Sequence, residues 1–191
     1  KDELSKDNSS NKEVYVRIPN LEIQKCFKND IQKRFNDVIK KDNLALNIAN
    51  ALLEGNVDFV QDKLGPLLRS FVSIRDTATR APHENYYHGF LNGIFTNCKD
   101  NLGEYLSNIE SGDGYPDILF KDIDCRKVAI IELKSAPIGS DIETLSEKAI
   151  SQIEDKKYAE PLMSNKTVKS IYGYGITFAG KSCAVSVKKL K

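Results

Sequence analysis

Hydrophobic and polar residues alternate along the chain with two different periods, which predict where helices and strands lie. Apolar residues that recur every three or four positions predict amphipathic helices, and short apolar runs bounded by turn residues predict strands. The predicted helices cover residues 21–41, 43–54 (ending at Gly55), 58–71 (interrupted by Gly65-Pro66), 84–97 and 142–158. The predicted strands cover residues 106–110, 118–120, 128–134, 169–179 and 183–189, after a short extended arm at 14–20.

The order of these elements predicts the fold class. A helix, three strands, a helix and two strands indicate an α/β core, with a mixed central sheet flanked by helices and an N-terminal helical extension before it. The 191 residues suffice for one domain with an appendage. We expect a disordered polar tail at 1–13, a helical linker or extension at 14–46, and the main domain at 47–191.

The predicted strand at 128–134 carries two charges that a buried strand normally lacks. Its four consecutive apolar residues and the following Leu133 predict a strand covered on both faces, where Glu and Lys are rarely found unless paired. Because side chains alternate across a strand, Glu132 and Lys134 share one face, while Ile131 and Leu133 share the other. Burying a carboxylate and an ammonium is costly, which indicates a functional reason for the pair.

A second acid is predicted to meet this pair. The glycine-rich segment 111–116 leads through Asp117 into the strand at 118–120, and the polar turn at 121–126 joins that strand to the next. Folding this hairpin brings Asp117 near Glu132 and Lys134. Two carboxylates about 4 Å apart repel by roughly 4 kcal/mol at an effective dielectric constant near 20, and a divalent cation such as Mg²⁺ or Mn²⁺ removes that penalty. The alternative is an exposed hairpin whose charges face water.

These motifs and their order resemble a known family. Pro116-Asp117 followed by Glu132-Leu133-Lys134 is similar to the signature of the PD-(D/E)xK nuclease superfamily. The wider pattern resembles the nuclease domain at the C-terminus of many bacterial proteins that begin with an AAA-type ATPase-like domain. Its further motifs are Glu84–Leu91, Ser111–Gly114, Gln152-Ile153 with Lys157-Tyr158, and Tyr174–Phe178. The resemblance covers roughly residues 47–187 and implies a restriction-endonuclease-like core.

The resemblance also implies roles for individual residues. Asp117 and Glu132 would bind the metal, with help from the backbone carbonyl of Leu133, and Glu84 would be a further ligand. Lys134 would hold or polarise the attacking water and stabilise charge on the phosphorus in the transition state. The alternative for Lys134 is a structural partnership with Glu132.

Two further residues are candidates on the flanking helices. Glu84 and His88 lie one helical turn apart, so they share a face, and His88 would contact phosphate or orient the water. In the resembling domains a Gln on the later helix approaches the active site, which implies that role for Gln152. A solvated pair on a helix face is the alternative for Glu84 and His88.

The amino-acid composition of the chain restricts its possible binding partners only slightly. The net charge of +1 is weak support for nucleic-acid binding, where a basic face is usual. The four cysteines lack Cys-x-x-Cys spacing, which argues against a zinc site or disulfide framework and predicts reduced thiols in a cytoplasm. No apolar run is long enough to cross a membrane and no signal-peptide pattern is present, so we expect no membrane partner.

The sequence leaves more than one function open. The first is a Mg²⁺- or Mn²⁺-dependent nuclease that hydrolyses phosphodiester bonds in DNA, with RNA as a less favoured substrate. The alternative is a catalytically inactive nuclease-like module that binds nucleic acid or a protein partner, which the near-neutral charge favours mildly. The chain begins with Lys rather than Met, so we interpret it as a fragment or processed product that an ATPase-like domain could precede. The oligomeric state is not predicted.

Overall fold

The computed structural model describes residues 33–72 and 83–191, and Phe35–Lys191 form one compact unit. The predicted tail at 1–13, the arm at 14–20 and most of the helix predicted at 21–41 lie outside the described residues. The end of that helix is described, and residues 33–40 are helical. The domain boundaries therefore stay a prediction.

Helices precede the sheet, as predicted. Their bounds are η1 Lys41–Asn43, α2 Leu44–Glu54, α3 Val57–Phe71 and α4 His83–Phe95, and Gly55 caps the end of α2. The interruption predicted at Gly65-Pro66 is wrong, because α3 continues through both residues. Glycine has no Cβ to clash with the following proline ring, and the buried stripe of Val60, Leu64, Leu67 and Leu68 holds the helix against the core.

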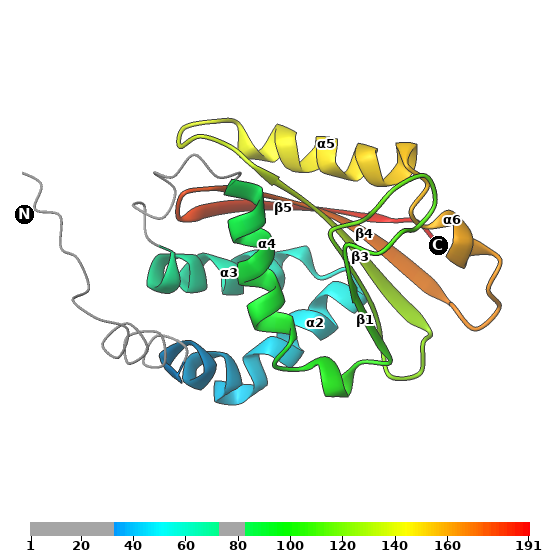
Figure 1. The fold of residues 1–191 in the computed structure, drawn as a ribbon, viewed down its shortest axis with the longest axis horizontal. Coiled ribbons are helices and arrows are strands. Elements are labelled where there is room, and N and C mark those ends of the chain that lie inside the picture. Colours follow the sequence, from blue (N-terminus) through cyan, green and yellow to red (C-terminus); the bar gives the residue numbers. More distant parts are fainter. Residues whose placement is uncertain (1–32, 73–82) are drawn as a thin grey trace, which may run out of the picture. The chain divides into compact units, whose positions relative to one another are not determined.

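Five strands form one mixed sheet in the order β1-β2-β3-β4-β5 (Figure 1). Their bounds are β1 Glu104–Ser107, β2 Ile118–Lys121, β3 Lys127–Ser135, β4 Ser170–Ala179 and β5 Ser182–Lys189. Neighbouring strands are antiparallel except for β3 and β4, which are parallel and are connected through helix α5, Ile142–Asp155. This arrangement confirms the predicted α/β fold with a mixed sheet and N-terminal helices.

The structure moves several predicted boundaries. Strand β1 ends at Ser107 instead of extending to residue 110, because Asn108 adopts a left-handed φ of 54° that turns the chain. Helix α5 ends at Asp155, three residues before the predicted end, and Lys157 adopts a φ of 55° as the chain reverses. Among the described residues, three short elements were not predicted, namely η1 Lys41–Asn43, η3 Lys99–Asn101 and α6 Glu160–Met163.

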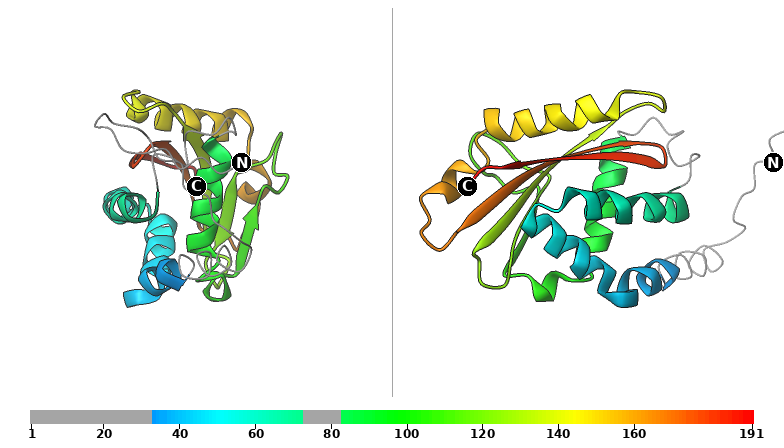
Figure 2. Two further views of the ribbon diagram at one scale, coloured as in Figure 1. Left: turned by 60° about the vertical axis from the view of Figure 1, so that its left-hand side comes forward. Right: turned by 180° about the vertical axis from the view of Figure 1, so that it is seen from behind.

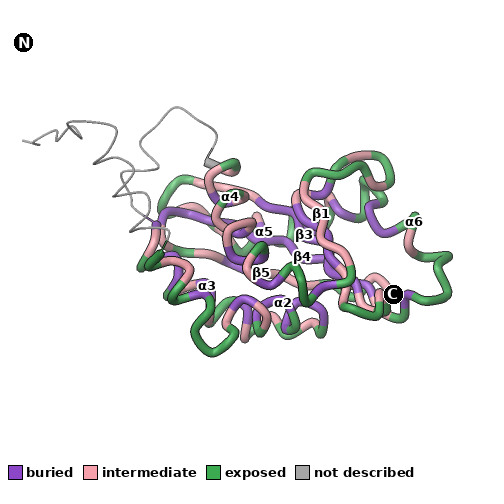
Figure 3. The backbone as a smooth tube through the Cα atoms, turned by 60° about the horizontal axis from the view of Figure 1, so that its bottom comes forward, coloured by how far each residue is buried: buried purple, intermediate pink, exposed green. Residues whose placement is uncertain are grey.

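Helices cover both faces of the sheet, with α2, α3 and α4 on one side and α5 on the other (Figure 2). Ala129, Ile131 and Leu133 of β3 join the core that contains the buried residues of α2, α3 and α4. Val128 and Ile130 join a second cluster that contains Ile153 of α5. The buried backbone in Figure 3 accordingly follows β3 and β4 between the two helical layers.

Helix α5 lies unusually close to the sheet because β4 has a glycine beneath it. A Cβ added to Gly175 would lie 1.8 Å from the backbone oxygen of Ser146, a distance that no side chain can tolerate. The close approach brings residues of α5 directly over the end of β3. Within the described residues, no helix is both long and apolar enough to span a membrane.

Candidate functional site

Glu132 is the buried charge at the centre of the candidate site. It lies near the end of β3 and is only 4% exposed. Its Oε1 accepts a hydrogen bond from Lys134 Nζ at 2.9 Å and another from Gln152 Nε2 on α5. Its Oε2 is buried and has no hydrogen-bond partner within residues 33–72 and 83–191. Because an unsatisfied buried carboxylate oxygen is costly, this atom is a ready ligand for a cation.

The surroundings of Glu132 favour its protonated form in the absence of a cation. Burial raises the pKa of Glu132 to about 7, and the nearby carboxylates of Asp117 and Glu84 also raise it, although the hydrogen bond from Lys134 opposes them. A bound divalent cation would reverse this balance, because it favours the ionised carboxylate.

Asp117 immediately precedes β2, and the β2–β3 hairpin carries it to the end of β3. Ile118 pairs with Ile131 in that hairpin. The Asp117 Oδ2 accepts a hydrogen bond from the backbone N–H of Leu133 at 2.7 Å. Burial nevertheless raises the pKa of Asp117, while that bond, His88 and Lys134 act to lower it. The hairpin therefore brings Asp117 to the two residues that flank Leu133.

Glu84 and Lys134 complete the charged group. Burial raises the pKa of Glu84, Lys134 lowers it, and Asp117 raises it, so this α4 carboxyl lies within the field of the β3 site. Burial would lower the pKa of Lys134, but its hydrogen bond to Glu132 and the three carboxylates raise it overall. Lys134 is therefore held as an ammonium, and the site contains three carboxyl groups and one ammonium.

His88 lies on the same face of α4 as Glu84 but makes different contacts. Its Nε2 is 3.1 Å from the backbone oxygen of Asp117 and 2.9 Å from Ser107 Oγ. Asn92, one turn further along α4, contacts the same ring. His88 therefore packs against the end of β1 and the residue that leads into the β2–β3 hairpin, and is not merely a solvated residue.

The donor set suits a hard cation that keeps water ligands. In residues 33–72 and 83–191, no three His, Cys, Asp or Glu side chains form a group that could hold a metal by themselves. Mg²⁺ needs no such group, because it is commonly bound through one or two carboxylates and retains several waters. Glu132 Oε2 and the Asp117 carboxylate fit that requirement. The roles of Glu84 and of the Leu133 carbonyl as ligands stay predictions.

The sequence interpretation missed most of the residues that surround the predicted ones. Asn92, Tyr105 and Ser107 form hydrogen bonds around His88, and none of the three was predicted. Helical spacing places Asn92 four residues after His88, and alternation places Tyr105 and Ser107 on one strand face. Those signals were present, but only the fold brings the helix and the strand together.

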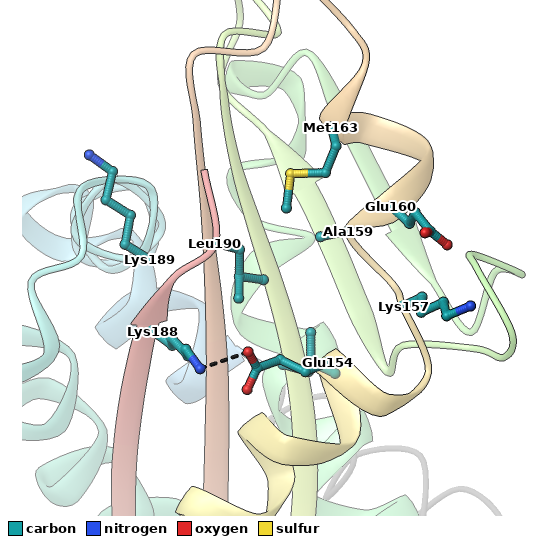
Figure 4. A pocket seen from close by; sticks show the side chains of 9 residues that line it. Glu154, Lys157, Ala159, Glu160, Met163, Lys188, Lys189 and Leu190 are labelled. Atoms are coloured by element: carbon teal, nitrogen blue, oxygen red, sulfur yellow. Dashed lines mark hydrogen bonds and ion pairs between the residues drawn. The ribbon is translucent and has the colours of Figure 1, made fainter.

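The surface also has a pocket that is separate from the charged site. A pocket of about 430 Å³ opens between the end of α5, α6 and the end of β5 (Figure 4). Ile153, Met163 and Leu190 contribute apolar surface, and Lys188 forms an ion pair of 2.7 Å with Glu154 at its edge. None of the predicted site residues lines this pocket, so it is not the charged site at the end of β3.

Comparison with known families confirms the resemblance at the level of the superfamily. The family described as the PD-(D/E)XK nuclease superfamily matches residues 82–188, which is more than half of the chain. The match contains all seven residues predicted for the site. No curated protein matches the chain.

Proposed function

Because this chain belongs to the PD-(D/E)XK nuclease superfamily, we propose that it is a metal-dependent phosphodiesterase that hydrolyses DNA. The observation that carries the proposal is the buried Glu132 Oε2, which has no hydrogen-bond partner among the described residues, in a carboxyl group that interacts with Asp117, Glu84 and Lys134. When all four groups are ionised, the excess is two negative charges, which one divalent cation balances. Membership in the superfamily indicates the class of reaction, and the charged group indicates where in the fold the reaction would occur.

Asp117 and Glu132 would hold the metal in this proposal, with the Leu133 carbonyl and Glu84 as further ligands. A divalent cation bound there would lower the pKa of a coordinated water and neutralise charge on the phosphate. Each acid already has one oxygen engaged by the protein, since Leu133 N–H binds Asp117, and Lys134 and Gln152 bind Glu132. These bonds fix both carboxylates in place before any ligand arrives.

Lys134 would stabilise negative charge on the phosphate oxygens, because its raised pKa keeps it protonated. A protonated lysine cannot accept a proton, so the general-base role is disfavoured, and electrostatic stabilisation or hydrogen bonding to the water is the supported role. Its Nζ is already directed to Glu132 at 2.9 Å, so the ammonium lies beside the proposed metal ligand.

A cleavage assay tests the proposal. Purified protein is incubated with end-labelled single- and double-stranded DNA and RNA of matched sequence, with Mg²⁺, Mn²⁺ or EDTA. We expect metal-dependent cleavage of DNA that Asp117→Asn abolishes, while circular dichroism shows an unchanged fold. The absence of cleavage of every substrate with every metal would reject the enzyme, and preferential cleavage of RNA would replace the proposed substrate.

The near-neutral net charge keeps one alternative in view, a nuclease-like module that binds nucleic acid or protein without cutting it. Such a module has no need for a buried carboxylate oxygen that lacks a partner. A gel-shift experiment in EDTA separates the two functions. A binding module would hold DNA equally well after Asp117→Asn and would never cleave it when metal is added.

A further inference from the structure

His88 is tied to Asp117 through its main chain. The His88 Nε2 lies 3.1 Å from the backbone oxygen of Asp117. Because a carbonyl oxygen can only accept, Nε2 carries the hydrogen and donates it. The same carbonyl also accepts from the backbone N–H of Asn108 at 3.1 Å. Ser107 Oγ lies 2.9 Å from Nε2 on the adjoining strand. His88 therefore connects α4 to both segments that meet at Asp117.

Tyr105 and Asn92 fix the orientation of the His88 ring. The Tyr105 hydroxyl donates to Asn92 Oδ1, which turns the Asn92 amide nitrogen toward the ring. That nitrogen lies 3.2 Å from His88 Nε2, 3.4 Å from His88 Nδ1 and 3.3 Å from Ser107 Oγ, so it contacts both ring nitrogens. Burial raises the pKa of Tyr105, and the Cys98 thiol adds to the effect, so the hydroxyl keeps its proton and remains a donor.

This arrangement places protein atoms against both ring nitrogens of His88. Its Nε2 contacts the Asp117 backbone oxygen, Ser107 Oγ and the Asn92 amide nitrogen, and its Nδ1 lies 3.4 Å from that same nitrogen. A role in binding phosphate or in holding the water, which the sequence suggested for His88, would require these bonds to break first.

We infer that Tyr105, Asn92 and His88 act in series to position Asp117, and that His88 is a positioning residue, not a phosphate ligand. The inference rests on the proposed function, because it gives Asp117 the role of metal ligand. The network holds the Asp117 main chain from the α4 side, and Leu133 N–H holds its carboxylate from the β3 side at 2.7 Å. Restraint at both ends would hold the other carboxylate oxygen in one place for the proposed cation.

Three variants test this inference. Tyr105→Phe removes one oxygen from the far end of the network, His88→Leu removes the donor, and His88→Gln keeps an amide N–H at about the same reach. We expect Tyr105→Phe and His88→Leu to weaken Mn²⁺ binding about tenfold in calorimetry. Cleavage should lose kcat with little change in KM, and His88→Gln should retain most of both. Tyr115→Phe, which removes an exposed hydroxyl from the segment before Asp117, is the matched control.

A metal-free measurement separates this inference from the proposed function. The NMR shift of the Leu133 amide proton reports its bond to Asp117, with Asp117→Ala giving the value for a broken bond. Tyr105→Phe and His88→Leu should move the shift toward that value whether or not the protein binds metal or cuts DNA. If His88→Leu does not fold, Tyr105→Phe decides. An unchanged shift and unchanged Mn²⁺ affinity would overturn the inference, as would equal loss of activity in His88→Gln and His88→Leu.

Discussion

The two faces of strand β3 differ in character, although successive residues of the same strand alternate between them. On the face toward α2, α3 and α4, Ala129, Ile131 and Leu133 are all fully buried and apolar. On the face toward α5, Val128 and Ile130 are equally buried, but Glu132 and Lys134 follow them. The first face is built for stability along its whole length. The second face is apolar as far as Ile130 and charged from Glu132 onward, so its charges lie at one end of the sheet.

Removal of the Lys134 charge should have the largest effect and tests most directly whether the two faces of β3 differ in function. Lys134→Ala should lower kcat for DNA cleavage by about 100- to 1,000-fold, because an ammonium that stabilises transition-state charge is lost. Single-turnover cleavage at saturating Mg²⁺ measures the loss. Lys127→Ala, on the same strand but paired with Glu54 at the surface, is the control and should leave the rate unchanged. Equal activity of the two variants would show that Lys134 is only a structural partner.

The opposite face should respond in stability and not in chemistry. Ile131→Ala should lower the free energy of unfolding by about 2–5 kcal/mol, because it leaves a cavity at a side chain with no exposure. Urea denaturation measures the change. The folded fraction should keep a near-normal cleavage rate per molecule. A large loss of kcat in fully folded Ile131→Ala would mean that the two faces are not separate in function.

Glu132 should make the metal-free protein less stable as pH rises. Its folded-state pKa is raised from 4.5 to about 7, so the folded state holds the proton more tightly than the unfolded state does. The contribution to stability is present at low pH and is lost as pH rises from about 4.5 to 7. Glu132→Gln should therefore raise the free energy of unfolding at pH 8 in EDTA by on the order of 1–2 kcal/mol. Parallel urea curves at pH 5 and pH 8 check this, and an equal effect at both values would contradict it.

The smallest expected effect belongs to Gln152, which reaches the charged face from α5. Gln152→Leu removes a donor to Glu132 Oε1 and should weaken Mn²⁺ binding by about tenfold without abolishing cleavage. Calorimetry measures the affinity. Ser151→Ala, at the exposed neighbouring position, provides the control. If Gln152→Leu binds Mn²⁺ as tightly as the unaltered protein, α5 contributes packing alone.

The sequence was most informative where one strand could be interpreted by itself. Alternation along β3 separated Glu132 from Ile131 correctly, and the turn residues predicted the β2–β3 hairpin that delivers Asp117. It was least informative where separate elements meet. Gly65-Pro66 suggested a break that the packing of Leu64 and Leu67 overrides, because burial of the helix face outweighs local preference.

The residues around the site also could not be predicted from local sequence patterns. His88 was identified from its spacing to Glu84, but its contacts to Ser107 and Asp117 depend on how α4 lies against β1 and β2. No local pattern specifies that packing. The roles of individual residues depended on the resemblance to a family, and they remain proposals until they are measured.

Calorimetric titration of Mn²⁺ at pH 8 tests the central claim most directly, since the claim is that Asp117 and Glu132 jointly bind a divalent cation. The account predicts one site in the unaltered protein, lost in both Asp117→Asn and Glu132→Gln, although the second variant is the more stable one without metal. Absence of binding in the unaltered protein, or binding that survives both substitutions, would contradict it.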